Sequence, residues 1–436
     1  MIAIIGAGIS GLTLAYELQK AGKPYILFES SSRPGGYIKS VQQGSYLLEV
    51  GPNSILVDKN FENFLSGLTL TDKIEDAAIV NKNRFIYKNN RIQKVPSGPL
   101  ALFFSSFFSF KTKVSVLKEA FNKTKTYPTE SVYDFFTRRF TSELTQYTVD
   151  PFATGVYAGD IKKLNMAETF PQVVAFEKEF GSVLKGVFKK GFGERRRTAS
   201  INGGLQTITD TLASKLQHIQ YNSKVLSLRE HVNGYMLDVQ KNDQIVEAYT
   251  VSKVVFCGTA FHSAEILKEE FPGVAKKLSD VNYAPVKAFY AAFKRADVEH
   301  KMQGFGCLYP SIEKSFLAGT IWNSSIFKNR CPEDEILTTS FIGGMHHPEY
   351  THLSDAELIQ RATKQVTRDL DIKGDPTFTY VAGWDKAIPQ YDLSLKEARV
   401  TIEECASKQI YFTSNWTQAI SLGTCVQNAQ LLAKIV

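Results

Sequence analysis

Cysteine is scarce in this sequence, and its few residues are far apart. The chain of 436 residues contains five, none of them in a Cys-x-x-Cys pair: Cys257, Cys307, Cys331, Cys405 and Cys425. An odd, scattered set predicts neither a disulfide framework nor a zinc site, and it fits a reducing cytoplasm. His346, His347 and His352 lack a helical His-Glu-x-x-His spacing, so we expect no bound metal.

Long apolar runs and dense basic clusters are also missing. No run reaches the roughly 18 residues that cross a bilayer, and the chain begins directly in an expected strand, which predicts no signal peptide. The net charge is +7, from 51 basic and 44 acidic residues spread along the chain. This distribution argues against nucleic acid as a partner and favours an anionic substrate or a membrane surface. With 43% hydrophobic residues, the chain can fill two or three domains.

The N-terminal segment MIAIIGAGISGLTLAYELQKAGKPYILFES contains a dinucleotide-binding pattern. Three glycines follow an apolar strand and open an amphipathic helix, and an acid ends the next strand. In this pattern the first glycine makes the tight turn, the second admits a pyrophosphate, the third packs helix on strand, and the acid binds ribose hydroxyls. Amides at the helix N-terminus face the phosphates. We assign these residues to a nucleotide cofactor: Gly6, Ala7, Gly8, Ile9, Ser10, Gly11 and Glu29.

Two later segments, SRPGGYIKS and GSYLLEVGPNS, indicate which nucleotide is bound. An arginine and a second glycine pair just after the ribose-binding acid resemble the FAD-binding segment of the flavin amine oxidase superfamily. The resemblance implies one FAD per chain, held non-covalently because the segment that approaches the flavin, GWDKAIPQYDL, contains no cysteine. The residues it adds to the FAD site are Arg33, Gly35, Gly36, Gly51, Pro52, Asn53 and Ser54.

The C-terminal segment IYFTSNWTQAISLGTCVQNAQLLAKI is expected to form a strand, a loop and a helix that return to the nucleotide domain. Ile420 and Ser421 fall in the first turn of that helix. A helix N-terminus directed at the flavin pyrimidine stabilises the negative charge that develops on reduction. The resemblance also implies flavin contacts for Val225, Trp384 and Trp416.

The segment PFATGVYAGDIKKLNMAETFP closely resembles a signature of the porphyrinogen oxidases, the flavoenzymes that complete the porphyrin ring system in haem synthesis. Supporting segments occur in the expected order, including NRFIYKNNRIQKVPSGP, INGGLQTITDTLASKL, GFGCLYP, LTTSFIGG and GWDKAIPQY. The resemblance covers essentially the whole chain. It implies a six-electron oxidation by hydride transfer to FAD, with dioxygen or a quinone as the final acceptor.

Gly155, Arg84 and Phe305 form the expected catalytic set. The backbone at Gly155 is predicted to form one wall of the substrate cavity facing the flavin; a tight turn or a close helix crossing is the alternative. Arg84 falls where protoporphyrinogen enzymes resemble one another in carrying an arginine for a propionate. We therefore favour protoporphyrinogen IX over coproporphyrinogen III. A flavin amine oxidase and a catalytically silent flavin-binding scaffold are the more distant alternatives.

The expected fold is α/β with α+β insertions. Segments 1–80, 196–275 and 386–436 are predicted to assemble a Rossmann-like FAD-binding domain, 276–385 a mixed-sheet substrate domain, and 81–195 a helical insertion. The insertion carries a phenylalanine cluster that belongs either to its core or to an interfacial patch: Phe103, Phe104, Phe107, Phe108 and Phe110. The adjacent Lys111 and Lys113 favour peripheral attachment to the inner face of the cytoplasmic membrane. The oligomeric state is left open between a monomer and a homodimer.

Overall fold

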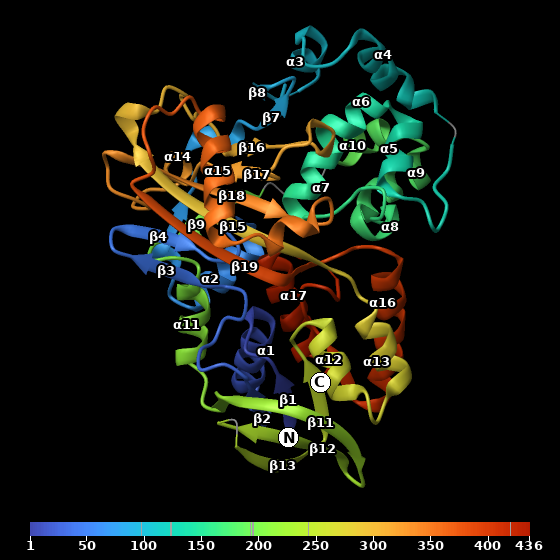
Figure 1. The fold of residues 1–436 in the computed structure, drawn as a ribbon. Helices are drawn as coiled ribbons and strands as arrows, with labels where there is room; N and C mark the ends of the chain where they lie inside the picture. The colour runs from blue at the N-terminus through green and yellow to red at the C-terminus, as the bar shows by residue number, and fades with distance from the viewer. Residues whose placement is uncertain (97, 123, 192, 194–195, 243, 419) are drawn as a thin grey trace.

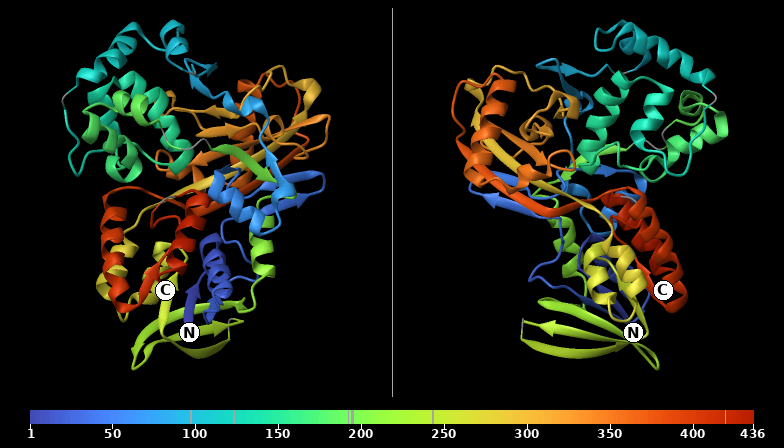
Figure 2. Two further views of the ribbon diagram at one scale, coloured as in Figure 1. Left: turned by 180° about the vertical axis from the view of Figure 1, so that it is seen from behind. Right: turned by 45° about the vertical axis from the view of Figure 1, so that its right-hand side comes forward.

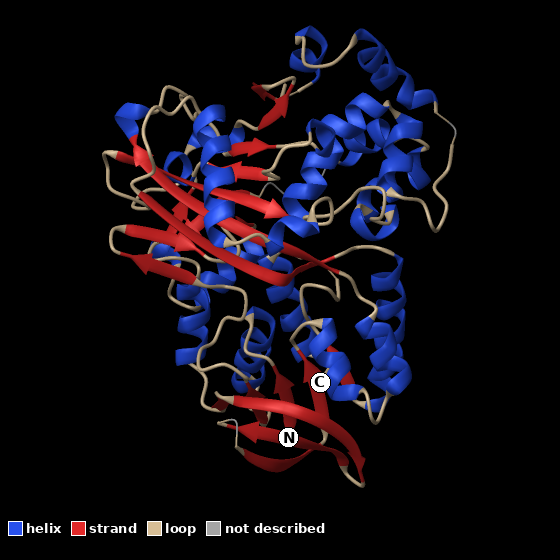
Figure 3. Cartoon of the chain, in the orientation of Figure 1, coloured by secondary structure: helices blue, strands red, loops and turns tan. Residues whose placement is uncertain are grey.

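The computed structural model describes residues 1–436 apart from 97, 123, 192, 194–195, 243 and 419. Both chain termini lie at one end of the molecule, beside a parallel sheet, and the opposite end holds a second large sheet next to a group of helices (Figures 1 and 2). The predicted α/β architecture with mixed sheets is confirmed (Figure 3).

The parallel sheet is built from segments far apart in the sequence. Its strands run in the spatial order β10 (Ile219–Gln220), β2 (Tyr25–Phe28), β1 (Ile2–Ile5), β14 (Lys253–Phe256) and β20 (Ile410–Phe412). Apolar residues alternate between its two faces: Ile2 and Ile4 pack into one hydrophobic core, whereas Ala3 packs into another. Helices cover these faces: α1 (Ile9–Lys20), α11 (Gln206–Ser214), α12 (Ala260–Leu267), α13 (Pro272–Ser279), α16 (Leu393–Cys405) and α17 (Leu422–Ala433).

Three smaller antiparallel sheets surround this unit. The first contains β11 (Ser223–His231), β12 (Gly234–Lys241) and β13 (Ile245–Val251). The second pairs β3 (Ser40–Gln43) with β4 (Tyr46–Glu49). The third contains β5 (Ile55–Val57), β9 (Arg197–Ile201) and β6 (Ile74–Asp76), and α2 (Lys59–Gly67) follows β5.

A seven-stranded mixed sheet dominates the other end of the molecule. Its spatial order is β19 (Phe378–Pro389), β15 (Tyr283–Lys294), β18 (Glu335–Gly343), β17 (Gly319–Ile321), β16 (Gly306–Leu308), β7 (Phe85–Lys88) and β8 (Arg91–Lys94). Only β16 and β7 pair in parallel. The region 81–195, expected to be a helical insertion, therefore begins with a hairpin that extends this sheet. Helix α15 (Asp355–Asp369) packs on one face, and α14 (Asn323–Ile326) lies near β18.

The helical lobe follows that hairpin in the sequence. It contains α3 (Pro99–Phe104), α4 (Phe110–Lys118), α5 (Val132–Arg139), α6 (Ser142–Leu144), α7 (Asp150–Tyr157), α8 (Met166–Thr169), α9 (Pro171–Phe180) and α10 (Val183–Lys190). Arg139 is buried at its centre, where it forms ion pairs with Glu119 and Glu177. A buried charge needs such partners, so this network ties three segments of the lobe together.

Several single-turn helices connect these elements. They are η1 (Thr71–Lys73), η2 (Ile79–Lys82), η3 (Glu119–Phe121), η5 (Arg295–Asp297), η6 (Ser311–Glu313), η7 (Pro348–His352) and η8 (Ala406–Lys408). A π-helical turn, η4 (Thr145–Val149), runs directly into α7.

The phenylalanine cluster divides into a buried and an exposed part. Phe107 and Phe108 are each 4% exposed and pack on Ile86 of β7, so these two belong to a core. Phe104 and Phe110 are 82% and 77% exposed. Within the described part of the chain, no helix combines the length and apolar character that a membrane span requires.

Candidate functional site

The turn between β1 and α1 depends on its glycines. Gly6 has φ 103°, a conformation that side chains rarely allow, and a Cβ at Gly11 would lie 2.0 Å from the Gly6 carbonyl oxygen. A Cβ at Gly8, by contrast, would meet no atom within 4 Å. Gly6 is therefore required by its backbone conformation and Gly11 by packing, while Gly8 leaves open space in front of the helix.

That open space is lined by backbone donors. Gly8 is the N-cap of α1 and forms a parallel bridge with Gly35, and no backbone hydrogen bond of the described chain is donated by the amides of Gly8 and Ser10. Such free amides at a helix N-terminus bind phosphate groups. Ala7 is fully buried, and its amide donates to the Glu29 carboxylate at 2.8 Å.

Glu29 is placed at the end of β2 to bind a further hydroxyl. Its Oε1 accepts hydrogen bonds from the amide and the hydroxyl of Ser31, both at 2.8 Å, whereas among the described donors its Oε2 accepts only from Ala7. A carboxylate offers about four acceptor positions, so Oε2 retains capacity for a ribose hydroxyl. The amide of Ser223 donates to the Glu29 carbonyl and brings β11, with buried Val225, beside this end of β2.

The glycine pair Gly35–Gly36 packs against the turn between β1 and α1. Gly35 donates to the Ala7 carbonyl at 2.8 Å, and a Cβ at Gly36 would lie 3.5 Å from the Cα of Gly8. Arg33 donates to the carbonyls of Pro34, Gly36 and Ile38. Its guanidinium thus holds this loop in shape, which is how Arg33 contributes to the predicted FAD site.

Residues 51–54 and the N-terminus of α17 lie close together. A Cβ at Gly51 would lie 2.0 Å from the Tyr37 carbonyl oxygen, so the chain passes too close for any side chain. Asn53 accepts from the Asn323 amide at 3.3 Å, and Pro52 and Ser54 are half-buried. Ser54 leads into β5, which contacts α17, whose N-cap is Ser421 with half-buried Ile420 before it. The predicted helix N-terminus therefore joins residues from the start of the chain.

The two predicted tryptophans occupy different environments. Trp416 is completely buried, and its indole nitrogen donates to the Gly258 carbonyl at 3.1 Å. The amide nitrogen of Gly258 lies 3.3 Å from the place of a Gly6 Cβ, so Trp416 supports the nucleotide turn through Gly258. Trp384 is half-buried on β19 and packs with Ala288 and Tyr290 of β15.

Strand register defines one face of the seven-stranded sheet. Residues directly opposite on neighbouring strands point to the same side, and the pairing aligns Ile86, Leu308, Gly319, Phe341, Ala288 and Ala382 in one row. We call this side of the sheet, including the same-side Arg84 and Trp384, the row face. The opposite face carries Phe289, Cys307 and Ile342, which pack under α15.

Arg84 and Phe305 lie together at one edge of the row face. The Arg84 guanidinium is centred 4.5 Å from the Phe305 ring, and the Phe305 amide donates to the Asn83 carbonyl. Arg84 also donates to the Asn81 carbonyl. Among the described residues it forms no ion pair. Desolvation lowers the pKa of Arg84 without discharging it, so the site presents an unneutralised cation beside an aromatic ring.

Gly155 lies beside Leu308 of β16, on the row face. It sits in α7, where a Cβ would approach the Leu308 side chain to 3.0 Å. The helix ends at Ala158, in the left-handed conformation with φ 47°, and no described donor is bonded to the Gly155 carbonyl. The signature is thus a helix rather than a turn, and the π-helical turn before it is a feature often found at functional sites.

Several residues of this site were not predicted from the sequence. Leu308 lies under Gly155, and Thr339 on β18 donates to Asn323, which in turn donates to Asn53. Three consecutive polar residues in a buried strand, Thr338 to Ser340, were the available signal. The sequence contains no signal for Leu308, because its position under Gly155 depends on the register of β16.

Comparison with known proteins confirms the resemblance. The sequence profile of the flavin-containing amine oxidoreductases matches residues 9–434. Protoporphyrinogen oxidase 2 of Arabidopsis thaliana is 30% identical over 100% of this chain and 93% of its own. Coproporphyrinogen III oxidase of Bacillus subtilis is 24% identical over 98% of this chain and 96% of its own.

Solved structures agree on the fold. A protein of Exiguobacterium sp. 255-15 assigned as a protoporphyrinogen oxidase superposes with a TM-score of 0.82 at 18% identity, covering 100% of this chain and 98% of its own. A putrescine oxidase variant superposes with a TM-score of 0.74 at 15% identity, with the same coverage. The open amides at Gly8, the free capacity of Glu29 and the glycine contacts all fit a flavin dinucleotide.

Proposed function

The chain belongs to the flavin-containing amine oxidoreductases, and we propose that within this family it oxidises protoporphyrinogen IX to protoporphyrin IX in haem biosynthesis. The observation that carries the proposal is the row face: Arg84, which has no ion-pair partner among the described residues, lies over the Phe305 ring, and Gly155, whose carbonyl accepts from no described donor, lies beside Leu308. A broad apolar macrocycle with anionic arms matches this combination of a cation, apolar side chains and a carbonyl acceptor.

The protein's part in the reaction is to hold the ring. Removal of six electrons in three steps requires the same macrocycle to be presented repeatedly. FAD held by the turn after β1, by Glu29 and by the N-terminus of α17 would supply the hydride acceptor, which dioxygen or a quinone would reoxidise. Gly155 accepts a hydrogen bond from pyrrole N–H groups, and Arg84 binds a propionate. Neither group needs to change its protonation state.

Turnover of the two porphyrinogens decides the substrate. The purified protein is supplied separately with protoporphyrinogen IX and coproporphyrinogen III, and porphyrin fluorescence is followed. We expect a higher kcat/KM for protoporphyrinogen IX. The relative from Bacillus subtilis keeps coproporphyrinogen III as the second candidate, and a reversed preference would establish it. Oxidation of amines with neither porphyrinogen turned over would refute both.

Replacing Arg84 by alanine is expected to raise KM for protoporphyrinogen IX about 30-fold with little change in kcat. The loss of one charged, partly desolvated hydrogen-bonded pair costs about 2 kcal/mol. Steady-state kinetics measure the effect. Arg84→Lys should recover only part of it, because an ammonium lacks the bidentate geometry.

Arg91→Ala is the matched control, since Arg91 is exposed on the neighbouring strand of the same hairpin. It should leave KM unchanged. Equal kinetics for the Arg84→Ala variant and the wild type would remove Arg84 from the substrate site.

The exposed phenylalanines point to a membrane surface. Phe110 directly precedes Lys111, and Lys113 donates to the carbonyl of Ser105, the residue after Phe104; other exposed apolar residues lie on the lobe at Leu117 and Phe121. Apolar side chains beside lysines are typical of peripheral contact with anionic lipid. We propose that the helical lobe attaches to the inner face of the cytoplasmic membrane, where an apolar substrate accumulates.

Changing Phe104 and Phe110 together to serine should weaken binding to anionic vesicles by at least about 100-fold. Burying each ring contributes about 1.5–3 kcal/mol. Vesicle co-sedimentation measures this, and the melting temperature should stay near that of the wild type. Phe107→Ser is the control: this ring is buried, so the variant should melt earlier. Unchanged sedimentation of the double variant would exclude lipid contact.

A further inference from the structure

One loop holds both ends of α7, the helix that carries Gly155. The loop follows β18. At the C-terminal end of the helix, the Met345 amide donates to the Ala158 carbonyl at 2.8 Å. At the N-terminal end, His346 Nε2 lies 3.3 Å from Asp150 Oδ1. Two consecutive loop residues therefore fix the helix at its beginning and at its end.

Asp150 also connects the helix to the strand beneath Gly155. Its Oδ2 accepts a hydrogen bond from the Ser311 amide at 2.8 Å, and Ser311 lies three residues after Leu308. The same carboxylate thus binds the loop after β18 through one oxygen and the segment after β16 through the other. A movement of Asp150 would change the spacing between Gly155 and Leu308.

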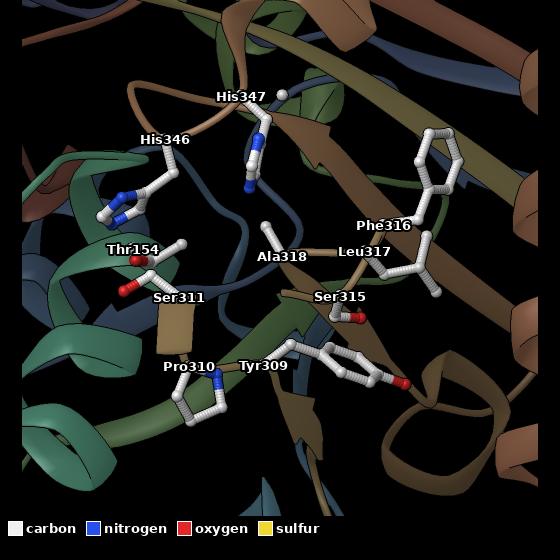
Figure 4. A pocket seen from close by; sticks show the side chains of 11 residues that line it. Thr154, Tyr309, Pro310, Ser311, Ser315, Phe316, Leu317, Ala318, His346 and His347 are labelled. Carbon is white, nitrogen blue, oxygen red and sulfur yellow. The ribbon is translucent and has the colours of Figure 1, made fainter. Parts of the chain in front are cut away.

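The pair is sheltered and has few other partners. Asp150 is 1% exposed, and among the described residues neither Asp150 Oδ1 nor His346 Nε2 forms a regular hydrogen bond. The buried hydroxyl of Thr154, one residue before Gly155, is likewise unbonded. Figure 4 shows the His346 ring on the same side of the cavity as Thr154 and Ser311, with His347 on a separate part of the rim. A carboxylate in this position depends on the imidazole for charge compensation.

We propose that the ion pair of His346 with Asp150 positions Gly155 over the row face, so that porphyrinogen oxidation requires His346 to be protonated. His346 and Asp150 are positioning residues that act through α7. The inference rests on the proposed function and extends it to a pH-dependent element outside the flavin and substrate contacts.

Three charged groups of α7 and the segment after it act on His346. Burial by itself would lower the pKa of His346, but the proximity and charge of Asp150 outweigh burial and hold the pKa above its ordinary value. Asp160, just beyond α7, raises the pKa further, and Lys162 opposes it. Because the folded-state pKa is raised, the charged pair is complete at acidic pH and is lost as pH rises through that pKa. The activity should therefore fall on the alkaline side.

The test compares three variants across a range of pH. In His346→Gln, kcat/KM for protoporphyrinogen IX should drop 10- to 100-fold, on the order expected for a misplaced site, and the alkaline step of the wild type should disappear. Because a lone buried carboxylate could unfold the chain, the double variant Asp150→Asn with His346→Gln supplies a neutral pair. It should keep its melting temperature and flavin yet show low, pH-independent activity.

His347→Gln is the matched control. His347 lines the same cavity, but its ring pairs with Glu349 and stacks on Tyr350, both in its own loop. This variant should keep the wild-type rate and the wild-type pH step. An equal loss of the step in His347→Gln, or its retention in the folded double variant, would overturn the assignment.

Hydrogen exchange gives a readout independent of turnover. The amides of Ala158 and Met345, which bond to the Thr154 and Ala158 carbonyls, should exchange faster in His346→Gln than in the wild type at one pH. Unchanged exchange at both amides would refute the positioning role of the His346–Asp150 pair even if porphyrinogens are oxidised. Faster exchange in a protein that oxidises neither porphyrinogen would instead support the positioning of α7 by this pair and refute the proposed function.

Discussion

A valine at position 155 is expected to lower turnover of protoporphyrinogen IX by at least about 100-fold while FAD stays bound. A Cβ at this position already comes within 3.0 Å of Leu308 Cδ2, and the valine methyl groups extend into the space above the row face. The nucleotide turn is built by other segments, so flavin content should be unaffected. Porphyrin fluorescence and flavin absorbance of the same preparation measure the two effects.

Gly155→Ala separates the fold from the site. Gly155 lies in a regular helix, where alanine is more stable than glycine by roughly 0.5–1 kcal/mol. Leu308 can move slightly to admit one methyl group. The alanine variant should therefore melt no earlier than the wild type, yet turn over more slowly. A substitution that preserves stability and reduces activity identifies a substrate wall.

The double variant of Gly155→Val with Leu308→Ala tests the alternative of a packing glycine. Truncating Leu308 relieves the contact within the protein but leaves the valine in the substrate space. Recovery of full turnover would show that Gly155 serves only the approach of α7 to β16. Loss of both flavin and melting cooperativity in Gly155→Val would show that the small residue serves the fold.

The nucleotide turn could be predicted because its chemistry is local. Gly6, Gly8 and Gly11 lie within six consecutive residues, and their spacing, with an apolar strand before it and an amphipathic helix after it, predicts that a helix N-terminus faces a cofactor. The acid at Glu29 follows one strand later, and the parallel pairing of β1 with β2 brings it to the same edge of the sheet. The relative positions of residues within a single β-α-β unit can be predicted without knowing the rest of the fold.

The substrate side depends on strand register, which the sequence does not state. Arg84 and Phe305 are more than two hundred positions apart and meet because β7 pairs in parallel with β16. Whether Leu308 faces Gly155 or α15 depends on a single residue of register. The resemblance supplied Gly155 and Arg84, but only the pairing shows that Arg84 and Leu308, the residue beneath Gly155, share a face with Phe341 and Trp384.

Residues of the same type differ in burial, and the sequence alone does not show which are buried. Phe104 and Phe107 are three positions apart, yet the first is exposed and the second is packed on Ile86. Trp416 and Trp384 have the same predicted role, but Trp416 is completely enclosed. An aromatic residue fills a core or a surface equally well, so its neighbours in space decide which it does.

Gly11→Ala is expected to yield a nearly flavin-free protein. A Cβ at Gly11 would lie 2.0 Å from the Gly6 carbonyl oxygen and 3.2 Å from Cys257 Cβ. The close atom belongs to the backbone, so the clash can be relieved only by moving α1 away from β1. That movement displaces the open amides of Gly8 and Ser10 at the start of α1, and both flavin content and melting temperature should fall. In the wild type, heat denaturation should release the flavin into solution, because the binding is non-covalent.

Gly8→Ala should remove flavin for a different reason. A Cβ at Gly8 meets no protein atom within 4 Å, and its φ of −71° suits alanine, so the protein stripped of flavin should melt as the wild type does when stripped. The methyl group nevertheless occupies the space in front of the α1 amides, where a pyrophosphate must approach the backbone. Comparing the two stripped proteins separates a disrupted turn from an obstructed cofactor. Full flavin occupancy in Gly8→Ala would mean that the pyrophosphate does not lie at this helix N-terminus.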